Sequence, residues 1–191
     1  ATGSSLSIAS GRVSYVLGLH GPCASYDTAC SAALTAYHAS MRALQLDDCA
    51  DGLAAGVNLM LMPSNGITFA IAGLTSSSGR SHTFDVRANG YARAEACGTV
   101  ALRQAREDSV TSQSILAIGS QVRQDGRSAS LTAPNGQAQQ ALLVATLADA
   151  DVVAETLTLG EAHGTGTSLG DPIEVRSIQT ALLASRGDTP L

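Results

Sequence analysis

The chain of 191 residues contains no lysine and no tryptophan, and its positive charge comes entirely from 11 arginines. Without a lysine, this chain can form neither a lysine Schiff base nor a phosphate-binding loop of the Walker type. Aromatic residues make up only 3% of the sequence. Its core must therefore be built from Ala, Val, Leu and Ile, packed closely through small residues.

Long apolar runs and clusters of basic charge are also missing. No stretch approaches the roughly 18 apolar residues that a membrane span needs, so we expect no membrane partner. The net charge is −5 and no basic patch is interleaved with aromatics, so we expect no nucleic acid partner. Cysteines in CxxC spacing and a signal peptide are both absent, which favours reduced thiols, no metal site and a cytoplasmic location. The cysteines are Cys23, Cys30, Cys49 and Cys97.

What remains is the composition of a globular domain, with 45% hydrophobic residues and 19 glycines. Helical spacing predicts helices over residues 4–17, 31–46, 67–74, 137–150 and from Asp171 through Leu182. Apolar runs predict strands before residue 27 and over residues 51–62, 91–103, 115–122 and 156–162. We expect the strand over 51–62 to be buried, the segment 63–66 to break it, and Gly98 to mark a close approach. Strands that alternate with helices predict an α/β fold with a largely buried sheet.

One cysteine lies where a predicted helix begins. The stretch DTACSAAL, residues 27–34, places Cys30 between an extended segment and that helix. At the first turn of a helix a thiol meets free N–H groups and the positive end of the helix dipole, and both favour the nucleophilic thiolate. A buried, inert cysteine is the alternative interpretation. Cys30 is therefore a candidate nucleophile.

A second motif lies far downstream. The stretch EAHGTGTSLGDPIE, residues 161–174, places His163 at the end of a predicted strand, followed by glycines and hydroxyls. The glycines allow the backbone to turn sharply and to approach a ligand, and Thr165 and Thr167 can hydrogen-bond to it. A phosphate-binding loop is disfavoured because no GK[ST] follows. We expect Asp171 to cap the next helix, with Pro172 at its first position.

The two motifs together resemble the two signatures of β-ketoacyl synthases, and more narrowly the ketosynthase domain of a modular type I polyketide synthase. The same resemblance is carried by further stretches: GRVSYVLGLHGP, AAGVNLML, and QDGRS with LTAPNGQAQ. It implies a thiolase-like αβαβα fold and a homodimer. We expect this chain to be the middle portion of such a domain. Residues 1–105 would end the half that carries the nucleophile, and residues 106–191 would begin the half that carries HGTGT.

The resemblance also implies roles for particular residues. Cys30 matches the acyl-accepting nucleophile and His163 the first of two catalytic histidines. Thr165 and Thr167 match the positions that hold the phosphopantetheine arm of an acyl carrier protein, and the domain itself binds no cofactor. The implied reaction is acyl transfer to Cys30, followed by decarboxylative Claisen condensation with a malonyl-type thioester. The family's second histidine and its lysine have no counterpart here, because the other histidines all precede His163 in unsuited contexts: His20, His38 and His82.

Some positions depart from the family pattern. His82 stands where lysine is frequent, and Ala94 and Ala96 replace glycines. The stretch RQDGRSASLTAPNGQAQQ resembles synthases of eukaryotic algae, which would add a plastid location. Four alternatives stay open: a fatty-acid elongating synthase, a thiolase, a Cys–His protease, and a non-elongating ketosynthase that serves as a binding or dimerisation module.

Overall fold

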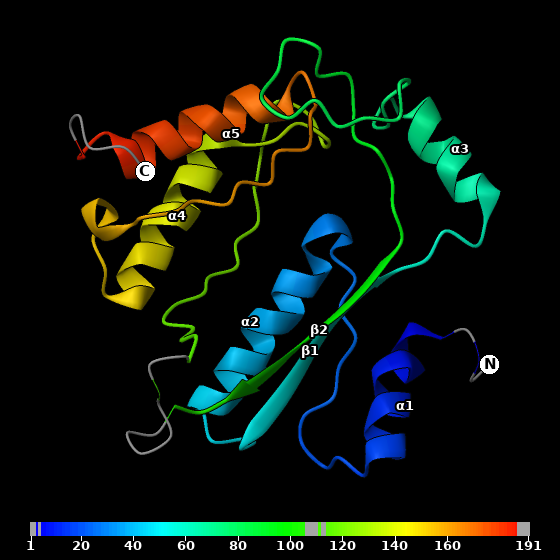
Figure 1. Ribbon diagram of the computed structural model, residues 1–191, viewed down its shortest axis with the longest axis vertical. Helices are drawn as coiled ribbons and strands as arrows, with labels where there is room; N and C mark the ends of the chain where they lie inside the picture. Colours follow the sequence, from blue (N-terminus) through cyan, green and yellow to red (C-terminus); the bar gives the residue numbers. More distant parts are fainter. Residues whose placement is uncertain (1–2, 4, 106–110, 112–113, 187–191) are drawn as a thin grey trace. The chain divides into compact units, whose positions relative to one another are not determined.

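The computed structural model describes residues 3, 5–105, 111 and 114–186 (Figure 1). The chain divides into two compact units. The first unit joins Ala1–Asn58 to Ala96–Ala117, and the second joins Leu59–Glu95 to Ile118–Leu191. Because each unit takes two segments of the chain, residues far apart in the sequence meet inside each of them. The units are described separately below.

The described residues of the first unit form two α-helices and an antiparallel pair of strands (Figure 1). Helix α1 (Leu6–Leu17) confirms the predicted first helix and ends at Gly18, whose φ of 67° is the left-handed conformation that terminates many helices. A 3₁₀ turn, η1 (Ala29–Ser31), leads directly into α2 (Ala32–Gln45). Strand β1 (Asp51–Asn58) pairs with β2 (Ala96–Arg103), in a register that places Asp51 opposite Arg103.

Helix α2 packs on the face of β1 that carries two glycines and an alanine. Alternation along the strand places Gly52, Ala54 and Gly56 on the same side. A Cβ atom at Gly56 would lie 2.8 Å from the Cβ of Ala33, and one at Gly52 would collide with the hydroxyl of Ser40. The glycines therefore let the helix approach the strand closely. Three buried residues form the core of this contact: Met41, Leu44 and Ala54.

Three predictions for the first unit are corrected. The predicted strand over residues 51–62 ends at Asn58, and its second face is exposed, with Leu53 and Val57 at 48% and 63%. A helix covers one face of a two-stranded sheet and leaves the other open, which is why the apolar run is not buried here. Gly98 has open space beside it, with no close approach. The segment before residue 27 forms no strand and pairs with no described segment.

Helices are the main regular elements among the described residues of the second unit. It contains α3 (Pro63–Ile71), α4 (Gly136–Ala150), a 3₁₀ turn η2 (Ala154–Thr156), and α5 (Gly170–Ile178), which continues into a wider turn, η3 (Gln179–Leu183). Helix α4 confirms the predicted helix over 137–150, and the Asn135 side chain caps it by accepting N–H groups of Gln137 and Ala138. Arg186 is buried, and its guanidinium donates to the carbonyl groups of Ala154 and Leu157. This arginine ties the end of η3 to η2.

Several predicted boundaries in the second unit are wrong. The strand has already ended at Asn58 before residues 63–66, and the helix predicted over 67–74 begins earlier, at Pro63, where a proline costs no hydrogen bond. Residues 115–122 and 156–162 form no strand, because no described segment pairs with them. Around residue 120 the backbone instead lies against α4, and the Ser120 N–H donates to the Asp149 carboxylate at 2.8 Å. Asp171 lies inside the first turn of α5, whose cap position is Leu169.

Candidate active site

Cys30 lies on a sharp turn at the start of a 14-residue helix. The preceding residue, Ala29, has a φ of 53°, a left-handed conformation that side-chain-bearing residues rarely adopt. The turn is fixed by the Thr28 carbonyl, which accepts the Ser31 hydroxyl at 2.9 Å. The Asp27 carboxylate accepts the Ala29 N–H at 3.5 Å. The strained residue thus presents an exposed Cys30 at the N-terminal end of α2, where the sequence analysis expected it.

An apolar groove of about 330 Å³ begins one turn after Cys30 on the same helix. Ala33, Leu34 and Tyr37 of α2 form one wall of it, and residues of β1 and β2 form the other. Leu34 is 71% exposed, so the groove is open. The nucleophile candidate and this apolar surface therefore belong to the same helix.

A single carboxylate holds the backbone around His163. The N–H of His163 donates to Oε1 of Glu174 at 2.6 Å, and the N–H of Gly164 donates to Oε2 at 2.8 Å. Glu174 lies on α5, and this two-pronged contact is charge-assisted, which makes it stronger than a contact between neutral groups. It fixes the direction in which the backbone presents the exposed imidazole of His163.

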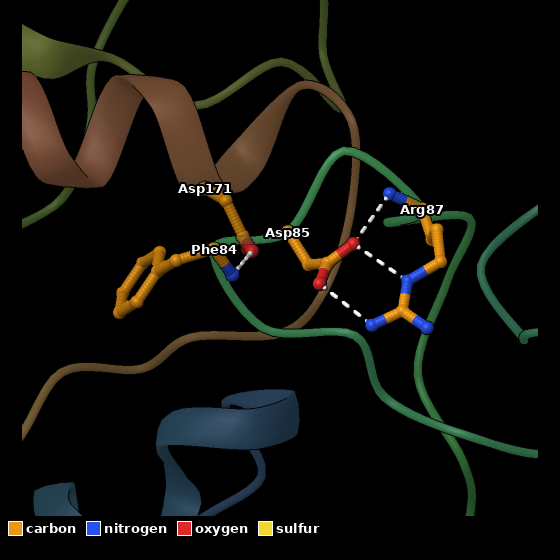
Figure 2. A network of polar contacts seen from close by, with 4 residues as sticks. All are labelled: Phe84, Asp85, Arg87 and Asp171. Atoms are coloured by element: carbon orange, nitrogen blue, oxygen red, sulfur yellow. Dashed lines mark hydrogen bonds and ion pairs between the residues drawn. The ribbon is translucent and has the colours of Figure 1, made fainter.

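A second carboxylate of α5 holds the rest of the loop. Asp171 is only 4% exposed. Its Oδ1 accepts the N–H groups of Gly166 at 3.0 Å and Thr167 at 3.3 Å. Its Oδ2 accepts the N–H of Phe84 at 2.7 Å, as Figure 2 shows. Hydrogen bonds therefore satisfy both oxygens of this buried side chain. The contact also joins the loop to the segment around Phe84, whose φ is 55°.

The glycines of the loop are needed both for conformation and for space. Gly164 and Gly166 have φ values of 51° and 73°. A Cβ atom at Gly164 would lie 2.6 Å from Cγ2 of Thr83, and one at Gly166 would lie 2.9 Å from the backbone N of His82. The carbonyl group of Gly166 accepts the N–H of Gly90 at 2.9 Å. Segment 82–90 therefore packs directly on the backbone of residues 163–167, the HGTGT loop.

The two threonines predicted to bind substrate are neighbours in the structure. The hydroxyl oxygens of Thr165 and Thr167 lie 3.1 Å apart, within hydrogen-bond distance. The Thr167 hydroxyl also accepts the N–H of Gly170 at 3.0 Å. Both threonines are partly buried. Two adjacent hydroxyls of this kind can offer a donor and an acceptor to a polar ligand.

The site has further supports whose roles the sequence analysis did not predict. Asp171 was expected only as a helix cap, and Glu174 was given no role. The two are three residues apart on α5 and so share one helix face, a spacing that could have identified them. Asp85 receives the Arg87 guanidinium through two bonds of 2.8 Å, shown in Figure 2, and this contact holds the pKa of Asp85 well below its usual range. Thr83 has no such signal in the sequence.

The predicted residues fall in both units. Cys30 belongs to the first, and His163, Thr165 and Thr167 belong to the second. The second unit brings the HGTGT loop together with segment 82–90, which is about eighty residues away in the chain. Among the residues that the structure describes, no cluster of His, Cys, Asp and Glu could hold a metal ion. No helix in the described ranges is both long and apolar enough to cross a membrane.

Comparison with known families decides what kind of protein carries this loop. Residues 1–108 match the family model described as "Beta-ketoacyl synthase, N-terminal domain", and residues 114–191 match "Beta-ketoacyl synthase, C-terminal domain". The chain belongs to the β-ketoacyl synthase family. This finding confirms the resemblance that the two motifs indicated.

The similar proteins are large polyketide synthases. The chain is 46% identical over 179 residues to the phenolphthiocerol synthesis polyketide synthase type I Pks15/1 of Mycobacterium bovis, a match that covers 93% of this chain and 8% of that protein. It is 44% identical over 193 residues to the erythronolide synthase EryA3 of Saccharopolyspora erythraea, covering 100% of this chain and 6% of that protein. This β-ketoacyl synthase chain thus spans a small part of its curated relatives.

Solved structures confirm the α/β, thiolase-like fold class. The ketosynthase from module 6 of the bacillaene synthase from Bacillus subtilis 168 matches with a TM-score of 0.90 and 33% identity, covering 98% of this chain and 34% of that chain. The oxazolomycin ketosynthase domain OzmH KS7 of Streptomyces albus JA3453 matches with a TM-score of 0.84 and 34% identity, covering 95% and 33%. The chain therefore spans about a third of each solved ketosynthase, and its layered fold is incomplete.

Proposed function

We propose that this chain is the part of a ketosynthase that carries Cys30 as the acyl-accepting nucleophile and His163 as a donor for condensation. The complete ketosynthase, meaning a polypeptide of the relatives' length that contains this chain, would extend acyl chains in polyketide biosynthesis. The observation that carries the proposal is the position of Cys30. In a chain of this family, a strained turn presents an exposed thiol at the N-terminus of α2.

The first step is acyl transfer. The Cys30 thiolate attacks the carbonyl carbon of an acyl thioester, and the carbon–sulfur bond to the carrier breaks. The carrier sulfur leaves as a thiolate, which takes up the proton that the Cys30 thiol had released. Backbone N–H groups ahead of α2 have no partner within the helix, so the N–H of Cys30 can donate to the oxyanion of the tetrahedral intermediate. Such a donor acts on charge that develops only during the reaction.

The second step forms the new carbon–carbon bond. A malonyl-type thioester loses CO₂, and the electron pair of the broken bond forms an enolate. His163, as a neutral imidazole, donates a hydrogen bond to the enolate oxygen. The enolate carbon then attacks the acyl–Cys30 carbonyl, and the Cys30 thiolate leaves. Glu174 supports this step by fixing the backbone on both sides of His163.

The remaining parts of the proposal concern what delivers the substrates. Thr165 and Thr167 would hydrogen-bond to the phosphopantetheine arm of an acyl carrier protein, since they offer paired hydroxyls beside His163. The ketosynthase would bind no cofactor of its own, act as a homodimer in the cytoplasm, and divide near residue 105 into its two halves. The named relatives come from bacteria, and nothing in the comparisons supports a plastid location.

The decisive experiment separates the two steps in the complete ketosynthase. Cys30→Ala should abolish acyl loading, measured by intact-protein mass spectrometry. His163→Ala should load normally but condense about 10²–10³ times more slowly. Cys97→Ala, which removes another exposed cysteine, is the matched control. Acyl loading on the Cys30→Ala protein, or unchanged condensation by the His163→Ala protein, would contradict the proposal.

The same experiment addresses the alternatives. A non-elongating ketosynthase would load without condensing in the unmodified protein. That reading is not favoured, because both Cys30 and His163 are present. A fatty-acid elongating synthase would accept acyl chains from a separate carrier protein. The similar proteins are polyketide synthases, which favours polyketide substrates.

A further inference from the structure

We infer that Thr83 is a positioning residue for His163, acting on Gly164, the residue that directly follows the histidine. The inference rests on the proposed role of His163. Thr83 touches neither substrate nor the reacting atoms in this account. Its effect passes through Gly164, whose backbone sets the direction of the imidazole-bearing residue before it.

Thr83 makes two contacts with one glycine. Its hydroxyl donates to the carbonyl oxygen of Gly164 at 2.6 Å. Its methyl carbon, Cγ2, lies only 2.6 Å from where a Cβ of Gly164 would be, so the methyl packs against the glycine backbone. A threonine can make both contacts because hydroxyl and methyl branch from the same stiff carbon. The side chain therefore fixes both the hydrogen bond and the packing of this peptide.

Gly164 is held from two directions. Its N–H donates to Glu174 on α5, and its carbonyl group accepts from Thr83 on segment 82–90. With a φ of 51°, Gly164 has no side chain to restrict its backbone rotation, so external contacts must do so. Removing one of the two contacts frees the glycine to rotate about the other. Without the Thr83 bond, the Gly164–Thr165 peptide can rotate relative to the peptide that joins His163 to Gly164, and the backbone at His163 is less firmly fixed.

Thr83 is itself held in place. The next residue, Phe84, donates its N–H to the buried carboxylate of Asp171, as Figure 2 shows. Asp171 and Glu174 lie on the same helix, α5. Segment 82–84 and the HGTGT loop are thus both hydrogen-bonded to the same helix, α5. This arrangement lets Thr83 act as a fixed support for Gly164.

The test uses three substitutions in the complete ketosynthase. Thr83→Val keeps the branched shape but removes the hydroxyl, and Thr83→Ser keeps the hydroxyl. Thr156→Val is the matched control, because the Thr156 hydroxyl also donates to a backbone carbonyl in an exposed position, that of Val153 at 2.8 Å. Acyl loading of Cys30, the kcat and KM of condensation, and the melting temperature are measured for each.

Thr83→Val should lower the kcat of condensation about threefold to tenfold, the loss expected from one modest hydrogen bond. Acyl loading and the KM for the malonyl carrier should stay unchanged. Thr83→Ser should restore most of the rate, and Thr156→Val should match the unmodified protein. A merely structural role would lower loading and condensation together with the melting temperature.

Three outcomes would overturn the inference: an unchanged kcat in Thr83→Val, an equal loss in Thr83→Ser, or a parallel fall in loading. Its failure is distinguishable from that of the proposed function. If His163→Ala condenses slowly while Thr83→Val condenses normally, only the role of Thr83 is wrong. If His163→Ala condenses at the normal rate, the proposed function fails as well.

Discussion

The carboxylate of Glu174 offers a sharp test of how the histidine is held. Glu174→Gln keeps the size and shape of the side chain but replaces one carboxylate oxygen by an amide NH₂. Both oxygens of Glu174 now accept N–H groups, from His163 at 2.6 Å and from Gly164 at 2.8 Å. Whichever way the glutamine amide turns, its NH₂ group faces one of these N–H donors. One hydrogen bond is therefore lost, and the other is made to a neutral acceptor instead of a charged one.

The size of the effect follows from these contacts. A hydrogen bond to a charged group contributes about 1.5–3 kcal/mol, and Glu174 is only partly buried, which favours the lower end. A loss of about 1.5–2 kcal/mol in the positioning of His163 corresponds to a condensation rate roughly 10 to 30 times lower. Acyl loading should stay normal, because it depends on Cys30 and the turn at Ala29.

The assay compares both steps in the complete ketosynthase. Loading is followed by intact-protein mass spectrometry and condensation by formation of the β-ketoacyl product. Glu161→Gln is the matched control: Glu161 is exposed, lies two residues before His163, and forms no hydrogen bond with any residue that the structure describes. If Glu174→Gln and Glu161→Gln condense at the same rate, the carboxylate does not position His163 and the reasoning is refuted.

Three further substitutions test other contacts. Asp171→Asn should destabilise the complete ketosynthase by about 3 kcal/mol, because an amide NH₂ would face a buried N–H; an unchanged melting temperature would contradict this. Gly166→Ala should cost about 2 kcal/mol, since its φ is 73° and a Cβ would lie 2.9 Å from His82; circular dichroism melting measures it. The hydrogen bond from Arg103 is the main cause of the lowered pKa of Asp51. Arg103→Ala should therefore remove a small stabilisation of the folded protein, which is present above the ordinary Asp pKa and is lost on acidification. A stability difference between the Arg103→Ala and unmodified proteins that does not change with pH would argue against this.

Periodicity predicted the helices well because a helix satisfies its own backbone. The helices found at Leu6–Leu17, Ala32–Gln45 and Gly136–Ala150 lie within a few residues of those predicted. Strands are different, since each needs a partner that its own sequence does not contain. The apolar runs at 115–122 and 156–162 have the composition of strands but pair with no described segment, whereas β1 pairs with β2.

The candidate site divides in the same way. Cys30 and His163 could be identified from residue type and local motif, and the acidic pair of α5 from its three-residue spacing. Thr83 could not be identified, because its contact with Gly164 spans 81 positions and depends on the path of the chain between them. The sequence likewise did not indicate that α2 packs against the glycines of β1.

The most direct test of the central claim is an experimental structure of the complete ketosynthase with an acyl group trapped on the enzyme. The account predicts that the acyl carbon is bonded to Sγ of Cys30. It also predicts that the imidazole of His163 opens into the same cavity, where an enolate carbon could approach the acyl carbon to about 3–3.5 Å. An acyl group bonded elsewhere, or a His163 ring that faces a separate cavity, would contradict the account.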